Sequence, residues 1–306
     1  MIVAKCPLRV SLAGGGTDLE KYIEHHDFGH VVNFSCNLYT YVSIHENNRD
    51  EYIVNYSLPE KVKRWQDIKN NLAREAFRRF DRGPITITFN SDIYSSGSGL
   101  GSSSSFCIAL IKAFNDFYNL GMSDFEICKT SIDIERTFNP LTGRQDAYGC
   151  GLGGLKYLKF LSDCENPEVT YLSKDVFKKV KMWLVPTKIE RVSTDPLTKT
   201  IDSDLSKFFD CASELKNRLI SNSYSKTVET ITKGWSIKKQ ETPHIIDSEE
   251  LKNIDDDFSE NPYILSHRLC GAGGGGYFFC MTPTVISIKD GIEIEIDDYG
   301  VKSYKI

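Results

Sequence analysis

The chain has 306 residues, of which 40% are hydrophobic and 26% are charged, a composition typical of soluble globular proteins. Its formal net charge of −5 argues against a large nucleic-acid interface, because such an interface needs a basic surface. No apolar run approaches the ~20 residues that a membrane-spanning helix needs, and the N-terminal residues lack the apolar core of a signal peptide. We therefore expect a soluble cytoplasmic protein with neither a nucleic-acid nor a membrane partner.

The nine cysteines are scattered along the chain and include no C-x-x-C pair. Most of them lie in apolar runs, as Cys107 does between Phe106 and Ile108. This pattern favours reduced, buried thiols over disulfides or a zinc site.

The first ninety residues read as a strand-rich region that one helix interrupts. A repeat of apolar residues at helical spacing predicts that helix around residues 72–80. Short runs rich in β-branched and aromatic residues predict strands at Ile2–Lys5, Tyr39–His45, Glu51–Tyr56 and Ile85–Phe89.

Two longer helices are expected in the middle of the chain. Apolar residues that recur every three to four positions predict the first over Ser102–Leu120, with serines at its start to bind the free N–H groups. A capping box at Ser123–Glu126 opens the second, which reaches about Phe138. Asn139–Gly143 then breaks the helix, and a strand is predicted at Leu155–Leu161.

A polar loop at Ser162–Pro167 is the expected domain boundary, which divides the chain into residues 1–164 and 165–306. The second part is expected to hold a strand near Met182–Val185, helices around Leu205–Ser221 and Glu249–Asn253, a glycine run and two terminal strands.

The most informative segment is the run from Ser95 to Ser105, which reads SSGSGLGSSSS and leads into the helix expected from Ser102. Glycines let a ligand approach the backbone, and a helix N-terminus offers free N–H groups with a favourable dipole. The run is not a Walker motif, since no Gly-Lys-Ser/Thr follows, and no G-x-S-x-G frame fits a nucleophile elbow. We interpret it as a phosphate-binding loop, with a flexible Gly/Ser loop as the alternative.

Two further glycine clusters allow a functional and a structural interpretation. Gly14–Asp18 is either a tight turn capped by Asp18 or a sugar site in which that carboxylate accepts hydrogen bonds from hydroxyls. Gly271–Gly276 satisfies G-x-G-x-x-G, but the strand Tyr277–Cys280 follows where a Rossmann motif needs a helix. A nicotinamide dehydrogenase is therefore disfavoured, and this segment is expected to support a nucleotide-binding loop or to form a tight turn.

These three clusters, in this order, resemble the GHMP small-molecule kinases, over about residues 1–160 and 260–280. Cys6–Asp18 and Gly143–Tyr148 are most similar to the D-glycero-D-manno-heptose 7-phosphate kinases of that superfamily, with fucokinases close behind. Ser95 stands where the family usually has proline, and Arg144 where the subgroup often has lysine. The resemblance implies an α+β fold of two domains with mixed and antiparallel sheets and an active site in the cleft between the halves.

The resemblance also implies the roles that these residues would have in an ATP-dependent sugar kinase. Asp146 is the expected catalytic base, and Arg9 beside it would stabilise developing negative charge, with Arg191 as a further candidate. Mg²⁺ is expected on Ser103 and Glu135, eleven positions before Asp146. The ATP phosphates are expected along Gly97, Ser98, Gly99, Leu100, Gly101, Ser102, Ser103 and Ser104. The acceptor sugar or sugar phosphate is expected on Gly15, Gly16, Thr17, Asp18, Arg144, Gln145, Gly273 and Gly274.

For the acceptor, the subgroup resemblance implies a heptose 7-phosphate that receives phosphate on its anomeric hydroxyl, with Arg144 binding the distal phosphate. The structural alternatives are a helix N-cap for Ser103, a surface ion pair for Glu135 and a loop cap for Asp146. The functional alternatives are a fucose- or galactose-type kinase and a catalytically silent nucleotide- or sugar-binding protein. A homodimer is left open.

Overall fold

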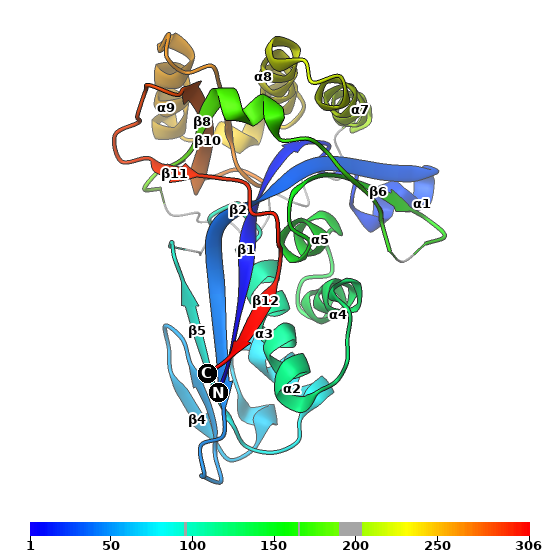
Figure 1. Cartoon of the computed structure of the whole chain (residues 1–306), viewed down its shortest axis with the longest axis vertical. Coiled ribbons are helices and arrows are strands. Elements are labelled where there is room, and N and C mark those ends of the chain that lie inside the picture. Colours follow the sequence, from blue (N-terminus) through cyan, green and yellow to red (C-terminus); the bar gives the residue numbers. More distant parts are fainter. Residues whose placement is uncertain (95–96, 165, 190–203) are drawn as a thin grey trace.

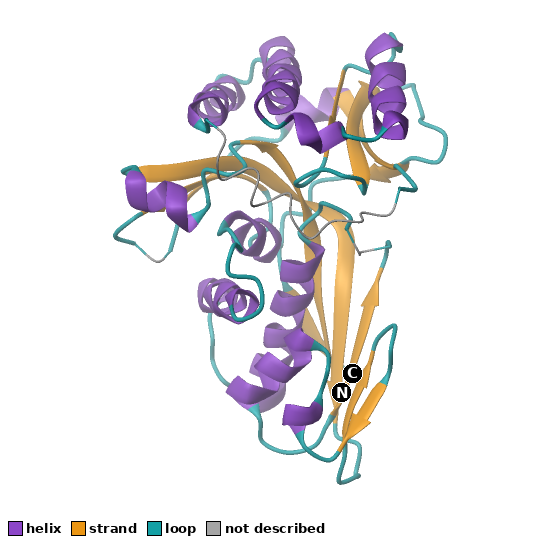
Figure 2. Ribbon diagram, turned by 180° about the vertical axis from the view of Figure 1, so that it is seen from behind, coloured by secondary structure: helices purple, strands orange, loops and turns teal. Residues whose placement is uncertain are grey.

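The computed structural model describes residues 1–94, 97–164, 166–189 and 204–306. Within these ranges the chain folds into an eight-stranded and a four-stranded sheet. Figure 1 shows helices α2 to α5 along one face of the larger sheet, and helices α7 to α9 gathered around the smaller one. Figure 2 shows the same arrangement from behind, with the two chain termini side by side on the larger sheet.

The larger sheet has the order β12-β1-β2-β5-β3-β4, with β6 paired to β2 and β7 to β6. Its strands are β1 (Ile2–Ala13), β2 (Phe28–His45), β3 (Tyr52–Asn55), β4 (Glu60–Val62), β5 (Thr86–Ser91), β6 (Leu155–Leu161), β7 (Glu168–Tyr171) and β12 (Lys302–Lys305). The smaller sheet has the order β11-β8-β10-β9. Its strands are β8 (Val180–Pro186), β9 (Ser266–Leu269), β10 (Tyr277–Pro283) and β11 (Ile292–Ile294).

Helices pack against both of these sheets. They are α1 (Glu20–His25), α2 (Asn71–Phe80), α3 (Ser102–Tyr118), α4 (Asp124–Arg136), α5 (Gln145–Gly151), α7 (Ser206–Ile220), α8 (Tyr224–Glu241) and α9 (Glu249–Glu260). Short 3₁₀ turns are η1 (Trp65–Asp67), η2 (Asp175–Lys179) and η3 (Pro243–Ile246). None of the helices in the described ranges is long and apolar enough to cross a membrane.

Strand β2 organises the larger sheet. It pairs with β1 along most of its length, with β6 through its first part and with β5 through its second. Irregularities in the β1–β2 register, between Pro7 and Leu8 and between Ser11 and Ala13, bend this ribbon, as β-bulges do. Helix α3 packs on β1 and β2 and is flanked by α2, α4 and α5.

The smaller sheet is buried on both faces. Successive side chains of β10 alternate between two apolar clusters, as the pleat of a strand requires. Phe278 and Cys280 join Trp183 and Trp235 on one face, whereas Phe279 joins side chains from β1, β2 and α7 on the other. This second cluster joins the smaller sheet to the bent end of the larger one.

The structure confirms the predicted α+β class, with a parallel β3–β5 pair in an otherwise antiparallel larger sheet. Strand Leu155–Leu161 and the capping box of Ser123 and Glu126 were predicted correctly. The nine cysteines are all free thiols, and Cys164 is the exposed one. The larger sheet crosses the division expected between residues 164 and 165, because β7 and β12 both belong to it. That division therefore stays a prediction about separate folding units.

Three predictions of local structure were wrong. Helices α1, α5 and α8 were not expected, and α5 places Asp146 in a helix instead of a loop. The serines that open α3 do not cap it; Gly101, in the left-handed conformation, is its N-cap. Ser104 and Ser105 instead donate across the fold, to Glu135 and to the carbonyl of Cys6, since a helix that packs on two strands presents its first turn to protein as well as to solvent.

The buried side chain of Lys156 forms a hydrogen bond to helix α5. The Lys156 ammonium donates to the Ser35 hydroxyl at 3.1 Å and to the carbonyls of Gly149 at 3.1 Å and Gly154 at 3.2 Å. Its side chain is fully buried, and burial lowers its pKa from the ordinary 10.5 to about 7. Between these two pH values the unfolded chain therefore binds more protons than the folded protein, and this site makes stability rise with pH.

We expect Lys156→Met to remove that pH dependence. Between pH 8 and 9.5 the free energy of unfolding should rise less steeply than in the wild type, by up to about 1.4 kcal/mol per pH unit, the value for one proton. Urea unfolding at three pH values measures the slope. Lys159→Met, on the same strand but in an exposed ion pair with Glu168, is the control and should leave the slope unchanged. Equal slopes for Lys156→Met and the wild type would show that Lys156 titrates normally.

Candidate active site

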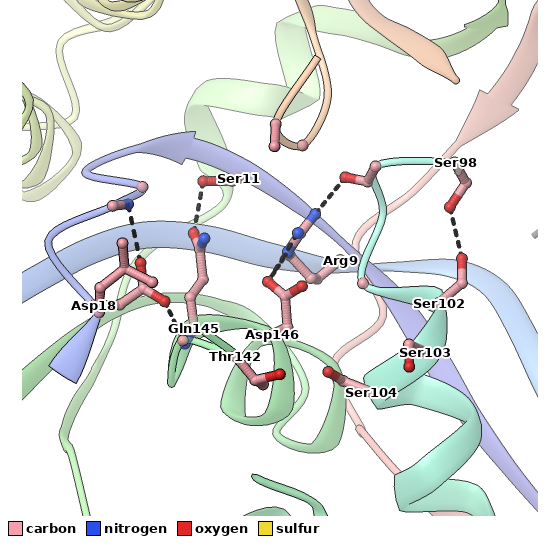
Figure 3. Close-up of a pocket in the computed structure, with 18 of the residues that line it drawn as sticks. Arg9, Ser11, Asp18, Ser98, Ser102, Ser103, Ser104, Thr142, Gln145 and Asp146 are labelled. Atoms are coloured by element: carbon pink, nitrogen blue, oxygen red, sulfur yellow. Dashed lines mark hydrogen bonds and ion pairs between the residues drawn. The ribbon is translucent and has the colours of Figure 1, made fainter. Parts of the chain in front are cut away.

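A cavity of about 490 Å³ is lined by residues from both parts of the chain. The first part contributes the end of β1, the loop before α3, and residues of α4 and α5. The second contributes residues of α7, α8 and β9 and the start of the glycine run at Gly271. Figure 3 shows Asp18 and Gln145 on one side of the Arg9–Asp146 pair, and Ser98 to Ser104 on the other.

The loop before α3 is shaped by close backbone packing. Gly99 has φ +75°, and a Cβ there would overlap the carbonyl of Cys270. In return, a Cβ on Gly271 would lie 2.5 Å from the Cα of Gly99. The third glycine cluster therefore supports the second, and the hairpin between β9 and β10 confirms that it is not a Rossmann motif. Residues at the start of α3 also line the cavity, and the N-terminus of a helix favours an anion.

Arg9 and Asp146 form the centre of the cavity. Both Arg9 nitrogens that face the carboxylate bind the same oxygen of Asp146, Nε at 3.0 Å and Nη2 at 2.8 Å. The remaining nitrogen, Nη1, donates to the carbonyl of Gly99 at 2.7 Å. Arg9 is buried, while the Asp146 side chain is 35% exposed to the cavity. One guanidinium thus ties the carboxylate on α5 to the glycine loop and leaves Asp146 Oδ2 without a partner among the described residues.

Ser103, Ser104 and Glu135 form a second polar group beside the loop. Ser104 donates to Glu135 Oε2 at 2.5 Å, and Ser103 lies exposed on the cavity surface. Burial raises the pKa of Glu135 to about 7, and hydrogen bonds from both serines lower it in part. No cation is paired with this carboxylate in the described ranges. A buried carboxylate with hydroxyls beside it suits Mg²⁺, which takes oxygen ligands.

On the opposite side of Asp146, Asp18 joins the first glycine cluster to α5. Its Oδ1 accepts from the N–H of Gly16 at 3.0 Å and its Oδ2 from the N–H of Gln145 at 2.9 Å. Burial raises the pKa of Asp18, and these backbone bonds lower it in part. Gln145 accepts from the Ser11 hydroxyl at 2.6 Å. The capping interpretation of Asp18 is therefore correct, while its side chain, Gly15, Gly16 and Gln145 also line the cavity.

Five residues expected in the site do not line the cavity. Leu100 is buried and supports Arg9 through its carbonyl, and the Thr17 hydroxyl binds the carbonyls of Gly14 and His30. Gly273 and Gly274 pack against Ile245 in η3.

Arg144, the fifth, pairs with Glu20, Nη2 to Oε1 at 2.7 Å, and donates to the carbonyls of Leu161 and Cys164. Its guanidinium is used within the fold, so we do not keep Arg144 as a phosphate ligand. Ser95 and Arg191 lie outside the described residues.

Several cavity residues were missed from the sequence. Ser11 follows Arg9 by two positions on β1 and so shares its face, a signal that strand periodicity offered. Lys238 and Thr242 lie one helical turn apart at the end of α8, but α8 itself was not predicted. Arg268 on β9 immediately precedes the glycine hairpin. These residues are remote in sequence, and the packing of the two sheets is what brings them together.

Comparison with known proteins places this arrangement in a class. Residues 68–154, which include the glycine loop, α3, α4 and α5, match the family model of the GHMP kinases N terminal domain. The match covers this central part of the chain, and the solved structures to which the chain is similar share its overall fold.

Among proteins of known name, the chain is similar to the D-glycero-alpha-D-manno-heptose 7-phosphate kinase of Campylobacter jejuni. The two are 26% identical over an alignment of 312 positions, which covers 92% of this chain and 90% of that one. The crystal structure of a D-glycero-D-manno-heptose 1-phosphate kinase from Bacteroides thetaiotaomicron has a TM-score of 0.77 at 22% identity, with 100% and 99% of the two chains covered. Galactokinase of Lactococcus lactis has a TM-score of 0.76 at 13% identity, with 100% and 95% covered.

Proposed function

We propose that the chain is an ATP-dependent sugar kinase that transfers the γ-phosphoryl group to the anomeric hydroxyl of a heptose phosphate. The observation that carries the proposal is the Arg9–Asp146 pair, which lies between a glycine loop before a helix and the Asp18–Gln145 cluster. Phosphoryl transfer needs the acceptor hydroxyl held in line with the donor phosphate and a base within reach of the hydroxyl proton, and residues suited to each role line the cavity. The named heptose kinases among its relatives support the choice of sugar.

The donor phosphates would lie along Gly97–Ser104. The N–H groups there and the N-terminus of α3 favour phosphate oxygens. Glycine at position 99 lets this loop pack against the backbone of Cys270, because a side chain there would collide with the Cys270 carbonyl.

The acceptor hydroxyl would lie against Asp146. Arg9 binds Oδ1 of that carboxylate and thereby orients it, so that Oδ2 can accept the hydroxyl proton. Asp18 and Gln145 would orient the sugar ring through hydrogen bonds to its other hydroxyls. Arg9 also stabilises negative charge that develops on the transferred group, since its guanidinium reaches Gly99 at the donor loop.

Ser103 and Glu135 are the residues that would hold Mg²⁺. The bound ion would neutralise charge on the phosphate oxygens. Glu135 fits this role, because a buried carboxylate without a cationic partner is stabilised by a cation from solution.

We expect Glu135→Gln and Ser103→Ala each to raise the Mg²⁺ concentration required for half-maximal turnover, by about tenfold or more, since changes around metal ligands reach this size. Magnesium titrations at saturating ATP measure the effect. Asp133→Asn is the matched control, because Asp133 lies on the same helix as Glu135 but forms an exposed ion pair with Arg79. Titrations that overlay the wild type, together with a lower Tm, would assign both residues a structural role only.

A coupled assay of ADP release tests the proposed function. The acceptors are D-glycero-D-manno-heptose 7-phosphate, the same heptose without phosphate, L-fucose and D-galactose, and ³¹P NMR identifies the phosphorylated position. Preference for the heptose 7-phosphate with a new anomeric phosphate is the expected result. Preference for fucose or galactose would change the sugar but keep the kinase, and absence of ATP turnover with every sugar would favour the catalytically silent alternative.

A cytoplasmic location is also proposed, because all nine cysteines are free thiols.

A further inference from the structure

We propose that Arg268 and Lys238 form an anion-binding wall in the cavity that holds the phosphate group already present on the acceptor. This inference rests on the proposed sugar kinase function and assigns the part of the site that Arg144 does not supply. Both residues line the cavity from the second part of the chain, Arg268 on β9 and Lys238 near the end of α8.

Arg268 is a buried cation without an acidic partner. Arg268 as a whole residue is only 5% exposed. One nitrogen, Nη1, donates to the carbonyl of Leu12, and Nε has no hydrogen-bond partner. No carboxylate forms an ion pair with Arg268 within the ranges that the structure describes. By contrast Arg9, the other buried arginine of the cavity, is paired with Asp146.

Such a cation is costly unless something compensates for it. Arginine stays protonated in proteins, and a buried charge without a partner destabilises a fold. Burial lowers the pKa of Arg268, and the positive charge of Arg9 nearby also acts to lower it. An anionic group of a ligand in the cavity would offset both effects, and a phosphate suits the planar guanidinium because it can accept two parallel hydrogen bonds.

Lys238 adds a second positive charge to the same wall. Its ammonium donates to the carbonyl of Gly271 at 2.5 Å, two residues after β9 ends. The acidic residues that line the cavity, Asp18, Glu135 and Asp146, all come from the first part of the chain. In the described cavity the carboxylates therefore come from the first part of the chain, whereas Arg268 and Lys238 add positive charge from the second.

The position of Arg268 favours the acceptor over ATP. Its contact, Leu12, directly follows Ser11, whose hydroxyl binds Gln145 on the acceptor side. The glycines at positions 15 and 16, which also line the cavity, come shortly after Leu12. The donor phosphates have their own backbone N–H groups between residues 97 and 104. A phosphate carried by the acceptor at the far end from its reacting hydroxyl could therefore reach Arg268 without displacing ATP.

Calorimetric titration of the full chain tests the assignment. The donor site is filled with a non-hydrolysable ATP analogue and Mg²⁺, and the two ligands are D-glycero-D-manno-heptose 7-phosphate and the same heptose without phosphate. The wild type should bind the phosphorylated sugar about 10- to 150-fold more tightly, as charge-assisted hydrogen bonds predict. Arg268→Gln should reduce this preference below about threefold and leave the affinity for the unphosphorylated sugar nearly unchanged.

Three further variants make the result specific. Lys238→Ala should reduce the preference by a smaller factor, about three- to tenfold, because a single ammonium is a weaker phosphate ligand than a bidentate guanidinium. Lys233→Ala, on the same helix in an exposed pair with Glu214, is the matched control and should leave the preference intact. Arg268→Lys keeps the charge and should retain part of the preference, so it tests the site even if Arg268→Gln folds poorly.

Two outcomes would overturn the inference. Equal losses for both sugars in Arg268→Gln would assign the arginine to the transferred phosphoryl group or to the fold, and an unchanged preference would remove it from the site. If the wild type phosphorylates none of the sugars, the proposed function fails separately, and the anion site is then tested by thermal shift with inorganic phosphate and the ATP analogue. Phosphate should raise the Tm of the wild type and not that of Arg268→Gln, and equal shifts would overturn the site itself.

Discussion

Asp146→Asn is expected to lower turnover by about 10²–10⁴-fold, the usual contribution of a general base. Asparagine keeps the size of the side chain but cannot take the proton of the acceptor hydroxyl. The KM for ATP should change little. Asp146 lies between the donor loop and the acceptor side and does not belong to the loop proposed to bind the ATP phosphates. Steady-state kinetics at saturating heptose 7-phosphate, with ATP varied, measure both quantities.

The Asp146 prediction has a matched control and a clear contrary result. Asp133→Asn removes a carboxylate from the exposed face of α4 and should retain wild-type turnover. If Asp146→Asn keeps more than about a tenth of the wild-type turnover, the carboxylate is not the base, and Asp146 serves only to hold Arg9. A fall in turnover together with a large rise in the KM for ATP would instead assign it to the donor.

Arg9→Met is expected to lower turnover by about 10²–10³-fold, the loss found when one preorganised donor to transition-state charge is removed. The substitution also removes the donor to Gly99 and both bonds that orient Asp146. Stability should fall less than the roughly 3–5 kcal/mol expected for breaking a fully buried pair, because the Asp146 side chain is 35% exposed and can be solvated. Turnover and chemical denaturation of the same variant separate these two effects.

The coupling between Arg9 and Asp146 is tested by combining their variants. If Arg9 acts mainly through Asp146, the double variant Arg9→Met/Asp146→Asn should lose little more turnover than the worse single variant, since residues that act as a unit are not additive. Arg9→Lys should recover part of the activity by keeping a positive charge beside the carboxylate. Fully additive losses would mean that the two residues contribute independently, and the orienting role of Arg9 would be wrong.

Short-range signals predicted those parts of the fold and site that depend on neighbouring residues. The capping box of Ser123 and Glu126 and the apolar run Leu155–Leu161 are local patterns, and the structure confirms both. The glycine loop was also correctly predicted to lead directly into helix α3, because a strand, a glycine run and an amphipathic helix follow one another along the chain. Asp146, Glu135 and Ser103 lie within 44 positions of each other, and the helices that carry them pack together.

Helix α5 shows where local reasoning failed. Its seven residues include two glycines, which lower helix propensity, so the sequence around Asp146 reads as a loop. The helix forms because Asp18 accepts from the N–H of Gln145 at its start, while Ser35 and Lys156 bind the carbonyl of Gly149 near its end. These partners come from other elements, and no window along the chain contains them together.

By itself, the sequence determined the α+β class, the position of the glycine loop before α3 and the order of three glycine clusters, because each depends on residues adjacent in the chain. Tertiary structure decided which charges face the cavity. Arg144 was assigned to the substrate but pairs with Glu20, whereas Arg268, which had no predicted role, lines the cavity without an acidic partner in the described part of the chain. The physical reason is that the worth of an arginine depends on the carboxylates within a few ångströms of it, and residues 124 or more positions apart come that close only after the sheets have packed.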